Sequence, residues 1–347
     1  MRPVRSLAVA AAAMAALATT AATPDHARGL PSTFHWSSSG PLIGPQSDAT
    51  HDIVAIKDPS VVYYHHRWHV FASTANNAGN YSMVYLNFRD WSHAGSATQH
   101  YLGDTAIGNG YRAAPEVFWF APQHRWYLVY QTGNASYSTN TDISNPAGWT
   151  APKNFYDGVP PIIQQNIGNG FWVDMWVICD RVNCYLFSSD DNGHLYRSQT
   201  TVADFPNGMS QPVIAMQDPN RFALFEASNV YRVAGTHQYL LLVEAIGSDG
   251  QRYFRSWTAP AIDGSWTPLA ATEANPFARA SNVAFAGTPW TADISHGEMI
   301  RAGHDQTLTI DPHHLHYLYQ GKDPSAGGDY NHLPWRLGLL TQIRGTP

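Results

Sequence analysis

The sequence predicts an all-β fold, a five-bladed β-propeller. Most of the chain consists of short alternating or aromatic-rich runs separated by Gly, Pro, Asn and Asp, which is the pattern of strands joined by turns. Long stretches with apolar residues at the helical spacing of three and four are missing from it. A unit of two strands and a turn also recurs five times along the chain, and five similar sheet units indicate five blades.

The repeat organises the chain from residue 57 onward. Each unit has a strand, a turn and an aromatic-rich second strand, and the units cover residues 57–71, 114–130, 173–187, 226–243 and 296–319. They begin at intervals of roughly 50 to 70 residues, which is the size of a propeller blade. A β-sandwich or a jelly roll with accidental similarity is the alternative. Five units that align on their aromatic second strands favour the propeller.

The first 28 residues have the layout of a secretory signal peptide. Two arginines closely follow Met1, an apolar stretch runs from Leu7 to about Leu17, and small residues come next, in the order that such signals require. A membrane anchor needs about 20 apolar residues, so this stretch is too short. We therefore predict a signal peptide over residues 1–28 and one secreted propeller domain over residues 29–347, with no membrane association.

Composition and charge restrict the partners of this protein. Only 13% of the residues are Asp, Glu, Lys or Arg, and another 13% are aromatic, whereas a globular protein carries about 25% charged residues. The net charge is −6 and the chain has no run of Lys or Arg, so the basic surface of a nucleic-acid binder is missing. Aromatic rings can stack on sugars or fill a β core, and composition alone favours the core.

Cysteine and histidine usage gives weaker signals. Cys179 and Cys184 are the only two cysteines, and in an oxidising compartment they would form one bridge that closes a small hairpin. Two unpaired buried thiols are the alternative. Histidine clusters at residues 65–66 and 313–316 lack the regular spacing of a zinc motif.

The repeat brings carboxylates together. The first strands of all blades converge on the central channel of a propeller, so residues at equivalent positions form a ring around its mouth. The aligned positions are Asp58, Ala114, Asp174, Glu226 and His296. Carboxylates in one pocket repel one another and their pKa values separate, so that one can stay protonated while another is ionised. Glycoside hydrolysis needs such an acid and a base, which activates water or attacks directly.

Neighbouring residues suggest the individual roles. Lys57 adjoins Asp58, and a nearby cation favours the ionised, basic form of a carboxyl. This holds only if the strand twists or ends there, because adjacent strand residues point to opposite faces. Glu226 follows the apolar run Phe222–Phe225, and an apolar setting raises the pKa of a carboxyl and suits a general acid. His296 binds an ion or water in the channel, or it is a structural histidine.

Five segments around these residues carry a resemblance to a known family. They are Ala55–Ser60, Val173–Trp176, Phe225–Tyr231, Asp293–Glu298 and Asp329–Asn331. These segments resemble those of glycoside hydrolase family 62, a family of secreted α-L-arabinofuranosidases related to family 43. The resemblance extends from about Thr33 to Arg344, which is essentially the whole chain.

The resemblance implies an inverting mechanism on a five-bladed propeller. In it, Asp58 would be the general base and Glu226 the general acid, while Asp174 would tune the acid and position the sugar. Lys57 and Met175 would line the arabinose pocket, and Tyr330 and Asn331 would contact the xylan backbone. His296 would lie at the central calcium site that the family commonly carries, with a structural role for the ion.

The implied function is a secreted α-L-arabinofuranosidase that removes arabinose side chains from arabinoxylan and arabinoxylo-oligosaccharides and acts as a monomer. A xylosidase or arabinanase similar to family 43 would share the propeller and the carboxylates, because loop shape sets the substrate. A sugar-binding propeller without catalysis is a rival of another class. Three aligned carboxylates argue against it, since a lectin needs no proton donor. A purely structural propeller would show no preference for sugars.

Overall fold

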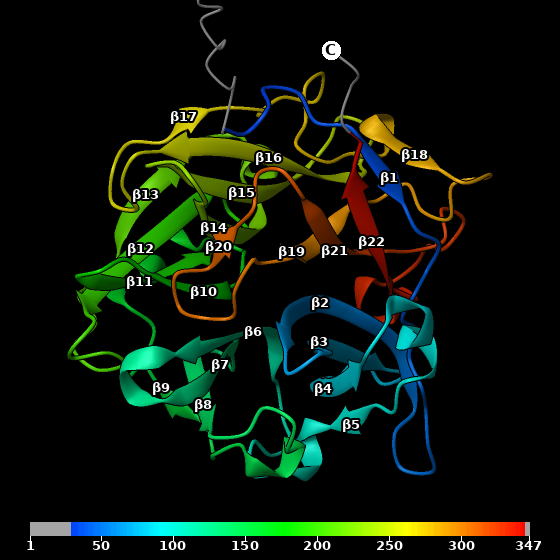
Figure 1. Cartoon of the computed structure of the whole chain (residues 1–347), viewed down its shortest axis with the longest axis horizontal. Coiled ribbons are helices and arrows are strands. Elements are labelled where there is room, and N and C mark those ends of the chain that lie inside the picture. Colours follow the sequence, from blue (N-terminus) through cyan, green and yellow to red (C-terminus); the bar gives the residue numbers. More distant parts are fainter. Residues whose placement is uncertain (1–28, 344–347) are drawn as a thin grey trace, which may run out of the picture.

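The computed structural model describes residues 29–343 and confirms the five-bladed β-propeller. Five sheets stand around a central axis (Figure 1). The predicted signal peptide at residues 1–28 lies outside the described residues. Within the described part, no helix is both long enough and apolar enough to span a membrane.

Blades 1 to 3 each contain four antiparallel strands in chain order. Blade 1 consists of β2 (Ile53–Tyr64), β3 (Arg67–Asn76), β4 (Tyr81–Phe88) and β5 (His100–Tyr101). Blade 2 consists of β6 (Ala113–Phe120), β7 (Arg125–Gln131), β8 (Ala135–Asn140) and β9 (Lys153–Asn154). Blade 3 consists of β10 (Val173–Cys179), β11 (Asn183–Ser189), β12 (His194–Thr201) and β13 (Val213–Gln217).

Blades 4 and 5 contain five strands each and depart from the simple chain order. Blade 4 consists of β14 (Glu226–Val233), β15 (Tyr239–Ile246), β16 (Arg252–Ala259) and β17 (Thr267–Pro268), with β20 (Thr309–Ile310) added parallel to β14. Blade 5 consists of β19 (Ser295–Met299), β21 (His316–Gly321) and β22 (Arg336–Gln342), followed by β1 (Trp36–Ser38) and β18 (Val283–Phe285). Because β1 pairs antiparallel with β22, the N-terminal and C-terminal segments close the ring in one sheet.

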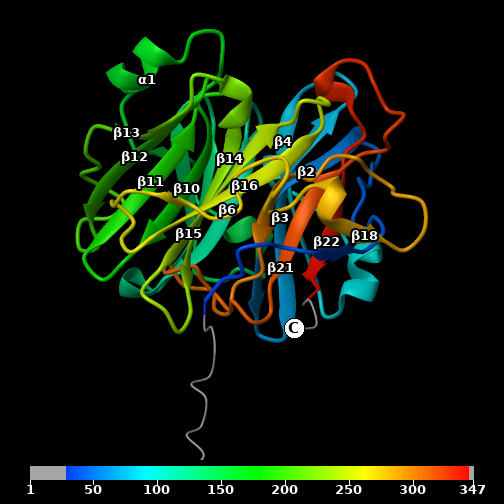
Figure 2. The ribbon, with the colours of Figure 1, turned by 90° about the horizontal axis from the view of Figure 1, so that it is seen from above.

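Helical structure is limited to short segments between the strands. The one α-helix of the described residues, α1 (Pro161–Asn166), lies between blades 2 and 3 in the sequence. Figure 2 shows it at one end of the propeller, away from the C-terminal end of the chain. The 3₁₀ segments η5 (Arg221–Ala223) and η7 (Tyr330–His332) precede β14 and β22.

Aromatic side chains fill the space between the sheets. Trp36, Trp126, Trp149 and Trp335 are among the largest fully buried side chains, and burying one large apolar side chain stabilises a fold by about 1.5–3 kcal/mol. Most rings therefore pack in the core, as composition alone suggested. The predicted disulfide is confirmed, since Cys179 and Cys184 are bonded with an S–S distance of 2.06 Å and close the turn between β10 and β11.

Every inner strand contains a bulge near its start. The pairing of β2, β6, β10, β14 and β19 with the next strand shifts register at residues 57–60, 113–116, 173–176, 226–229 and 295–297. A bulge bends a strand and redirects its side chains. In four blades a residue in the bulge has a left-handed backbone, with φ of 48° at Asp58, 50° at Ala114, 58° at Asp174 and 53° at Ala227, which is uncommon outside glycine.

The backbone N–H groups at these bulges form a ring of hydrogen bonds between blades, which we call the bulge ring. In four of the five, the N–H donates to a side chain in the second strand of the preceding blade. The pairs are Asp58 to Gln320 Oε1 (2.7 Å), Ala114 to Ser73 Oγ (2.7 Å), Asp174 to Gln131 Oε1 (2.6 Å) and His296 to Glu244 Oε2 (2.6 Å). The fifth donor, Ala227, reaches Asp174 Oδ2 instead (2.7 Å).

The bulge ring corrects one expectation from the repeat. Ala227, and not Glu226, is the structural equivalent of Asp58 and Asp174, because it has the left-handed backbone and donates to the neighbouring blade. Glu226 lies one residue earlier, where it pairs with Glu244 as Lys57 pairs with Ser73. The bulge nevertheless leaves Glu226 at the mouth of the channel, as the next section describes.

Candidate active site

All five inner strands line one cavity of about 770 Å³. They contribute Lys57 and Asp58 from β2, Ala113 from β6, Asp174 from β10, Glu226 from β14 and His296 from β19. The cavity also includes Ile167, next to α1, and Tyr330 of η7, so it opens at the end of the propeller that carries both segments in Figure 2. The prediction that Asp58, Asp174, Glu226 and His296 face one space is thus confirmed.

The side chains of Lys57 and Asp58 enter this cavity together. Adjacent residues of a regular strand point to opposite faces, but the bulge at Asp58 brings Lys57 Nζ to 3.7 Å from Asp58 Oδ1. Lys57 Nζ also donates to the Tyr330 hydroxyl at 2.9 Å. Burial alone would lower the pKa of Lys57, but Asp58 and Tyr330 raise it well above its ordinary value. The ammonium group therefore stays charged between the Asp58 carboxyl and the Tyr330 hydroxyl.

Asp174, from blade 3, lines the same cavity. Burial raises the pKa of its carboxyl well above the ordinary value, and the charges of Glu226 and Asp58 raise it further. The Ala227 N–H, which donates to Oδ2 at 2.7 Å, only partly offsets this. The carboxyl of Asp174 is thus held by two blades, since it belongs to blade 3 and accepts the Ala227 N–H of blade 4. This arrangement suits a residue that positions other groups.

Glu226 is ion-paired with Arg252, which the sequence reading missed. Arg252 Nη1 contacts both Glu226 Oε1 and Glu244 Oε1. Burial alone would raise the pKa of Glu226, but the charges of Arg252 and Lys57 lower it below its ordinary value. The expectation that the apolar run before Glu226 raises its pKa is therefore wrong for the free protein. Arg252 begins the third strand of blade 4, outside the two-strand repeat unit, so the repeat could not reveal it.

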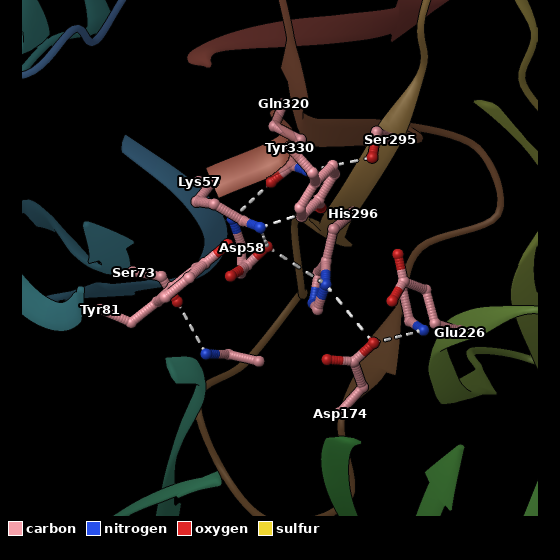
Figure 3. A network of polar contacts seen from close by, with 12 residues as sticks. Lys57, Asp58, Ser73, Tyr81, Asp174, Glu226, Ser295, His296, Gln320 and Tyr330 are labelled. Carbon is pink, nitrogen blue, oxygen red and sulfur yellow. Dashed lines mark hydrogen bonds and ion pairs between the residues drawn. The ribbon is translucent and has the colours of Figure 1, made fainter. Parts of the chain in front are cut away.

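His296 stands between the two aspartates. Its Nδ1 lies 3.5 Å from Asp58 Oδ1 and 3.8 Å from Asp174 Oδ2, and Figure 3 shows the three side chains in a row. Calcium prefers six to eight oxygen ligands, whereas residues 29–343 contain no group of three His, Cys, Asp or Glu side chains arranged to hold a metal. One imidazole beside two carboxylates does not complete such a shell, so water would have to supply the remaining ligands of a calcium ion at His296. We derive no chemical step from a metal here.

Three further predicted residues differ in their placement. Tyr330 and Asn331 line the cavity on the side of Lys57, and Asn331 Oδ1 accepts a hydrogen bond from the Tyr81 hydroxyl at 2.9 Å. Met175 does not line it: this side chain is 2% exposed and packs in the hydrophobic core. Successive side chains of β10 point to opposite faces, so that Asp174 faces the cavity and Met175 faces the core.

A fourth cavity carboxyl, Asp191, was also missed. It lies in the turn between β11 and β12 and lines the cavity, where its side chain hydrogen-bonds with Glu226. Its sequence context, Asp190-Asp191-Asn192-Gly193, reads as an ordinary turn. Nothing in that pattern distinguishes it from a solvent-exposed loop.

Comparison with known proteins identifies the family of this chain. The model of glycosyl hydrolase family 62 matches residues 35–341. α-L-Arabinofuranosidase C of Cellvibrio japonicus is 44% identical over 321 residues, which cover 92% of this chain and 48% of that protein. The chain therefore spans about half the length of the curated relative it matches.

Two solved structures are more similar still. The catalytic domain of a family 62 α-L-arabinofuranosidase from Coprinopsis cinerea is 68% identical, with a TM-score of 0.89 over 90% of this chain and 98% of that one. A family 62 hydrolase in complex with xylotriose is 57% identical, with a TM-score of 0.88 over 90% of this chain and 98% of that one. With a matching family model over nearly its whole length, a shared propeller and a carboxylate-lined cavity, the chain belongs to glycosyl hydrolase family 62.

Proposed function

We propose that this protein is a secreted, inverting α-L-arabinofuranosidase that releases arabinose side chains from arabinoxylan and arabinoxylo-oligosaccharides. The observation that carries the proposal is the convergence of Asp58, Asp174 and Glu226, from three blades, on one cavity. The pKa of Asp174 is raised and that of Glu226 is lowered. Glycoside hydrolysis needs a carboxylic acid and a carboxylate beside one glycosidic bond, and the assignment of these two roles to Glu226 and Asp58 follows the family resemblance.

In this mechanism Asp58 is the general base. It removes a proton from a water molecule, whose oxygen attacks the anomeric carbon of arabinofuranose, while the bond from that carbon to the xylose oxygen breaks. Glu226, in its protonated form, gives its proton to the leaving oxygen. Single displacement by water inverts the anomeric centre. Lys57 supports the role of Asp58 by its position, since its ammonium group lies 3.7 Å from Asp58 Oδ1.

The rim of the cavity supports a polymeric substrate. Tyr330 and Asn331 lie at its edge, and Phe171, which is 70% exposed, lines it from the loop before β10. Exposed aromatic rings offer faces for sugar stacking. A family 62 relative that shares the fold binds xylotriose. We infer that the xylan backbone crosses this rim while one arabinose side chain enters the cavity.

The first experiment measures sugar release from wheat arabinoxylan by the wild type, by Glu226→Gln and by Glu273→Gln. The last variant makes the same chemical change at a partly exposed carboxyl that pairs with Arg279, away from the cavity. We expect wild type and Glu273→Gln to release arabinose that appears first as the β anomer by NMR. Glu226→Gln should lose about 10²-fold or more in rate, since acid–base catalysis contributes that much.

Other products would count against the proposal. Release of xylose or of oligosaccharides would favour an activity like that of family 43. Absence of any product from the wild type would favour a binding propeller, and an α anomer appearing first would contradict inversion.

Secretion and a monomeric state belong to the same proposal. The Cys179–Cys184 disulfide supports secretion, because such bonds persist in oxidising compartments. Calcium at His296 stays a prediction with a structural role only. The test is the melting temperature of chelator-treated protein with and without added calcium. Added calcium should raise the melting temperature of the wild type and not that of His296→Ala. An equal response of both proteins would place any calcium elsewhere.

A further inference from the structure

The proposed mechanism requires a proton on Glu226 that the free protein does not favour there. Arg252 contacts the Glu226 carboxylate directly, and the pKa of Glu226 lies below its ordinary value. A general acid with a lowered pKa would be ionised, and therefore inactive, near neutral pH. A protonated carboxyl in contact with Glu226 would supply that proton directly.

Asp191 is such a group. Its side chain lies in the cavity, mostly buried, and is within hydrogen-bonding contact of Glu226. Two carboxylates can make this contact only if one of them carries a proton. Oδ1 of Asp191 is also buried, and no donor of the described residues reaches it. A buried carboxyl oxygen without a partner is costly, and a proton shared with Glu226 removes that cost.

The turn that carries Asp191 is built to hold it in place. Asp191 has a left-handed backbone with φ of 53°, a conformation that few residues other than Gly, Asn and Asp adopt readily. The preceding residue, Asp190, is fully buried and accepts hydrogen bonds from the Asn192 N–H at 2.9 Å, from His194 Nδ1 at 2.8 Å and from the Tyr196 hydroxyl at 2.8 Å. Asp190 thus fixes the turn, and Asp191 is free to face Glu226.

We propose that Asp191 and Glu226 share one proton in the free protein, and that Asp191 supplies it to Glu226 when Glu226 acts as the general acid. Asp191 acts through Glu226 and does not touch the glycosidic bond, so it is a positioning residue. The inference rests on the proposed function and adds a group that the family resemblance did not indicate.

The charged surroundings agree with a proton on Asp191. Burial raises the pKa of Asp191 far above its ordinary value, the charges of Glu226 and Asp174 raise it further, and Arg252 lowers it only in part. Arg252, from β16, faces both carboxyls of the pair, whereas Lys57 of β2 and His296 of β19 face Glu226. The two groups therefore titrate as a pair, in which the first proton is lost easily and the second is retained.

The protons gained and lost by the protein balance over one turnover. A proton moves from the Asp191 carboxyl to the Glu226 carboxylate, and Glu226 then passes it to the xylose oxygen as the glycosidic bond breaks. The attacking water forms the new bond to the anomeric carbon and gives its proton to Asp58. After product release, Asp58 returns its proton to solvent and the Asp191–Glu226 pair takes one up.

The test is the pH dependence of kcat/KM on an arabinoxylo-oligosaccharide for the wild type, Asp191→Asn and Asp218→Asn. Asn tolerates the left-handed backbone but carries no titratable proton, and its amide N–H favours ionised Glu226. The alkaline limb of Asp191→Asn should therefore move to lower pH by about one unit or more. At about pH 8 its rate should fall roughly 10- to 100-fold, and at about pH 5 it should stay within about threefold of the wild type.

Asp218→Asn is the matched control, because Asp218 is a neighbouring carboxyl outside the cavity that lies 3.7 Å from Arg255. Its profile should match the wild type. Asp191→Gly, which suits the same backbone, should also lose alkaline activity, and melting temperatures show whether each variant folds. An unchanged profile for Asp191→Asn, or an equal loss at every pH, would overturn the inference while wild-type arabinose release leaves the proposed function standing. A wild type without arabinose release would remove the proposed function itself.

Discussion

Individual carboxyl groups near the propeller axis differ in protonation because their nearest neighbours differ. Glu226 contacts Arg252, and its pKa is lowered. Asp174 and Asp191 have no cation in direct contact within the described residues, and their pKa values are raised chiefly by burial. Burial likewise raises the pKa of Glu116, which lies deeper in the channel. Contact with an arginine does not decide the direction alone, because Glu244 contacts the same Arg252 and burial still raises its pKa to about 7. Burial and the full set of neighbouring charges together set the pKa of each carboxyl.

Glu116 offers a stability prediction of its own. Burial raises its pKa well above the ordinary value, although the Val177 N–H and Arg301 act in the other direction. A raised folded-state pKa means that the stability contribution is complete below the unfolded pKa and is lost as pH rises toward the folded pKa. Glu116→Gln removes this titration. We expect the free energy of unfolding of the variant, relative to wild type, to increase from about pH 4.5 upward, by at most about 1.4 kcal/mol per pH unit.

Urea unfolding of both proteins between acidic and alkaline pH measures this difference. Glu273→Gln is the control of opposite sign. Burial alone would raise the pKa of Glu273, but hydrogen bonds from Ser248 and Arg279 lower it, so its substitution should give no gain with rising pH. A pH-independent difference for Glu116→Gln would show that Glu116 is ionised in the folded protein.

Some site residues were predictable from sequence and others were not, for physical reasons. Asp58, Asp174 and His296 fall in the repeat, so their convergence followed from the propeller. Arg252 and Asp191 lie in a third strand and in a turn, where the blade repeat places no chemical constraint. Met175 was assigned to the pocket through family resemblance, yet it packs in the core. Side-chain direction after a bulge depends on backbone geometry that residue identity does not reveal.

At the scale of elements, the bulge is the feature that builds the site. Strands, turns and blade order followed from periodicity, but periodicity could not locate the bulges. Inner strands such as β6 and β10 are buried along almost their whole length, so they have no alternation that an added residue would interrupt. That is why Glu226 aligned with Asp174 in the sequence while Ala227 takes the equivalent position in the structure. The offset lets blade 4 present a long carboxyl from the position that Lys57 occupies in blade 1.

The bulge ring predicts unequal costs for two identical substitutions. Ser73 and Ser189 occupy corresponding positions in the second strands of blades 1 and 3. Ser73 Oγ accepts the Ala114 N–H at 2.7 Å, whereas Ser189 Oγ is buried without a partner in the described residues. Ser73→Ala leaves a buried N–H unsatisfied, which costs about 1–3 kcal/mol. Ser189→Ala should be close to neutral.

The urea unfolding midpoints of Ser73→Ala and Ser189→Ala, compared with wild type, test this predicted difference in stability. Both substitutions delete one hydroxyl from a fully buried strand position. The free energy of transferring the side chain from water to the interior therefore changes equally in both and cancels in the comparison. Equal losses of stability would mean that the bulge ring adds nothing to the fold beyond ordinary strand pairing.

At the scale of the whole molecule, an ion cluster on the axis connects the blades. Arg301 pairs with Glu298 at 2.7 Å between Nε and Oε1, and its Nη2 donates to the carbonyls of Val61 and Val117 at 3.0 and 2.8 Å. Glu298 accepts the Val61 N–H at 3.0 Å, and Glu116 accepts the Val177 N–H at 2.6 Å. Blades 1, 2, 3 and 5 therefore meet at one buried polar centre beneath the cavity. These contacts fix the positions of the inner strands that line the cavity.

The closure of blade 5 has a consequence for the topology of the chain. Because β1 pairs with β22, and the Ile343 N–H donates to the His35 carbonyl at 2.8 Å, the segment at His35 and the end of the described chain lie side by side. They also lie at the end of the propeller away from α1 and the cavity mouth. A circular permutant that joins these ends and opens at an exposed turn between blades would keep every blade intact. A protein fused at either end would likewise emerge away from the sugar-binding face.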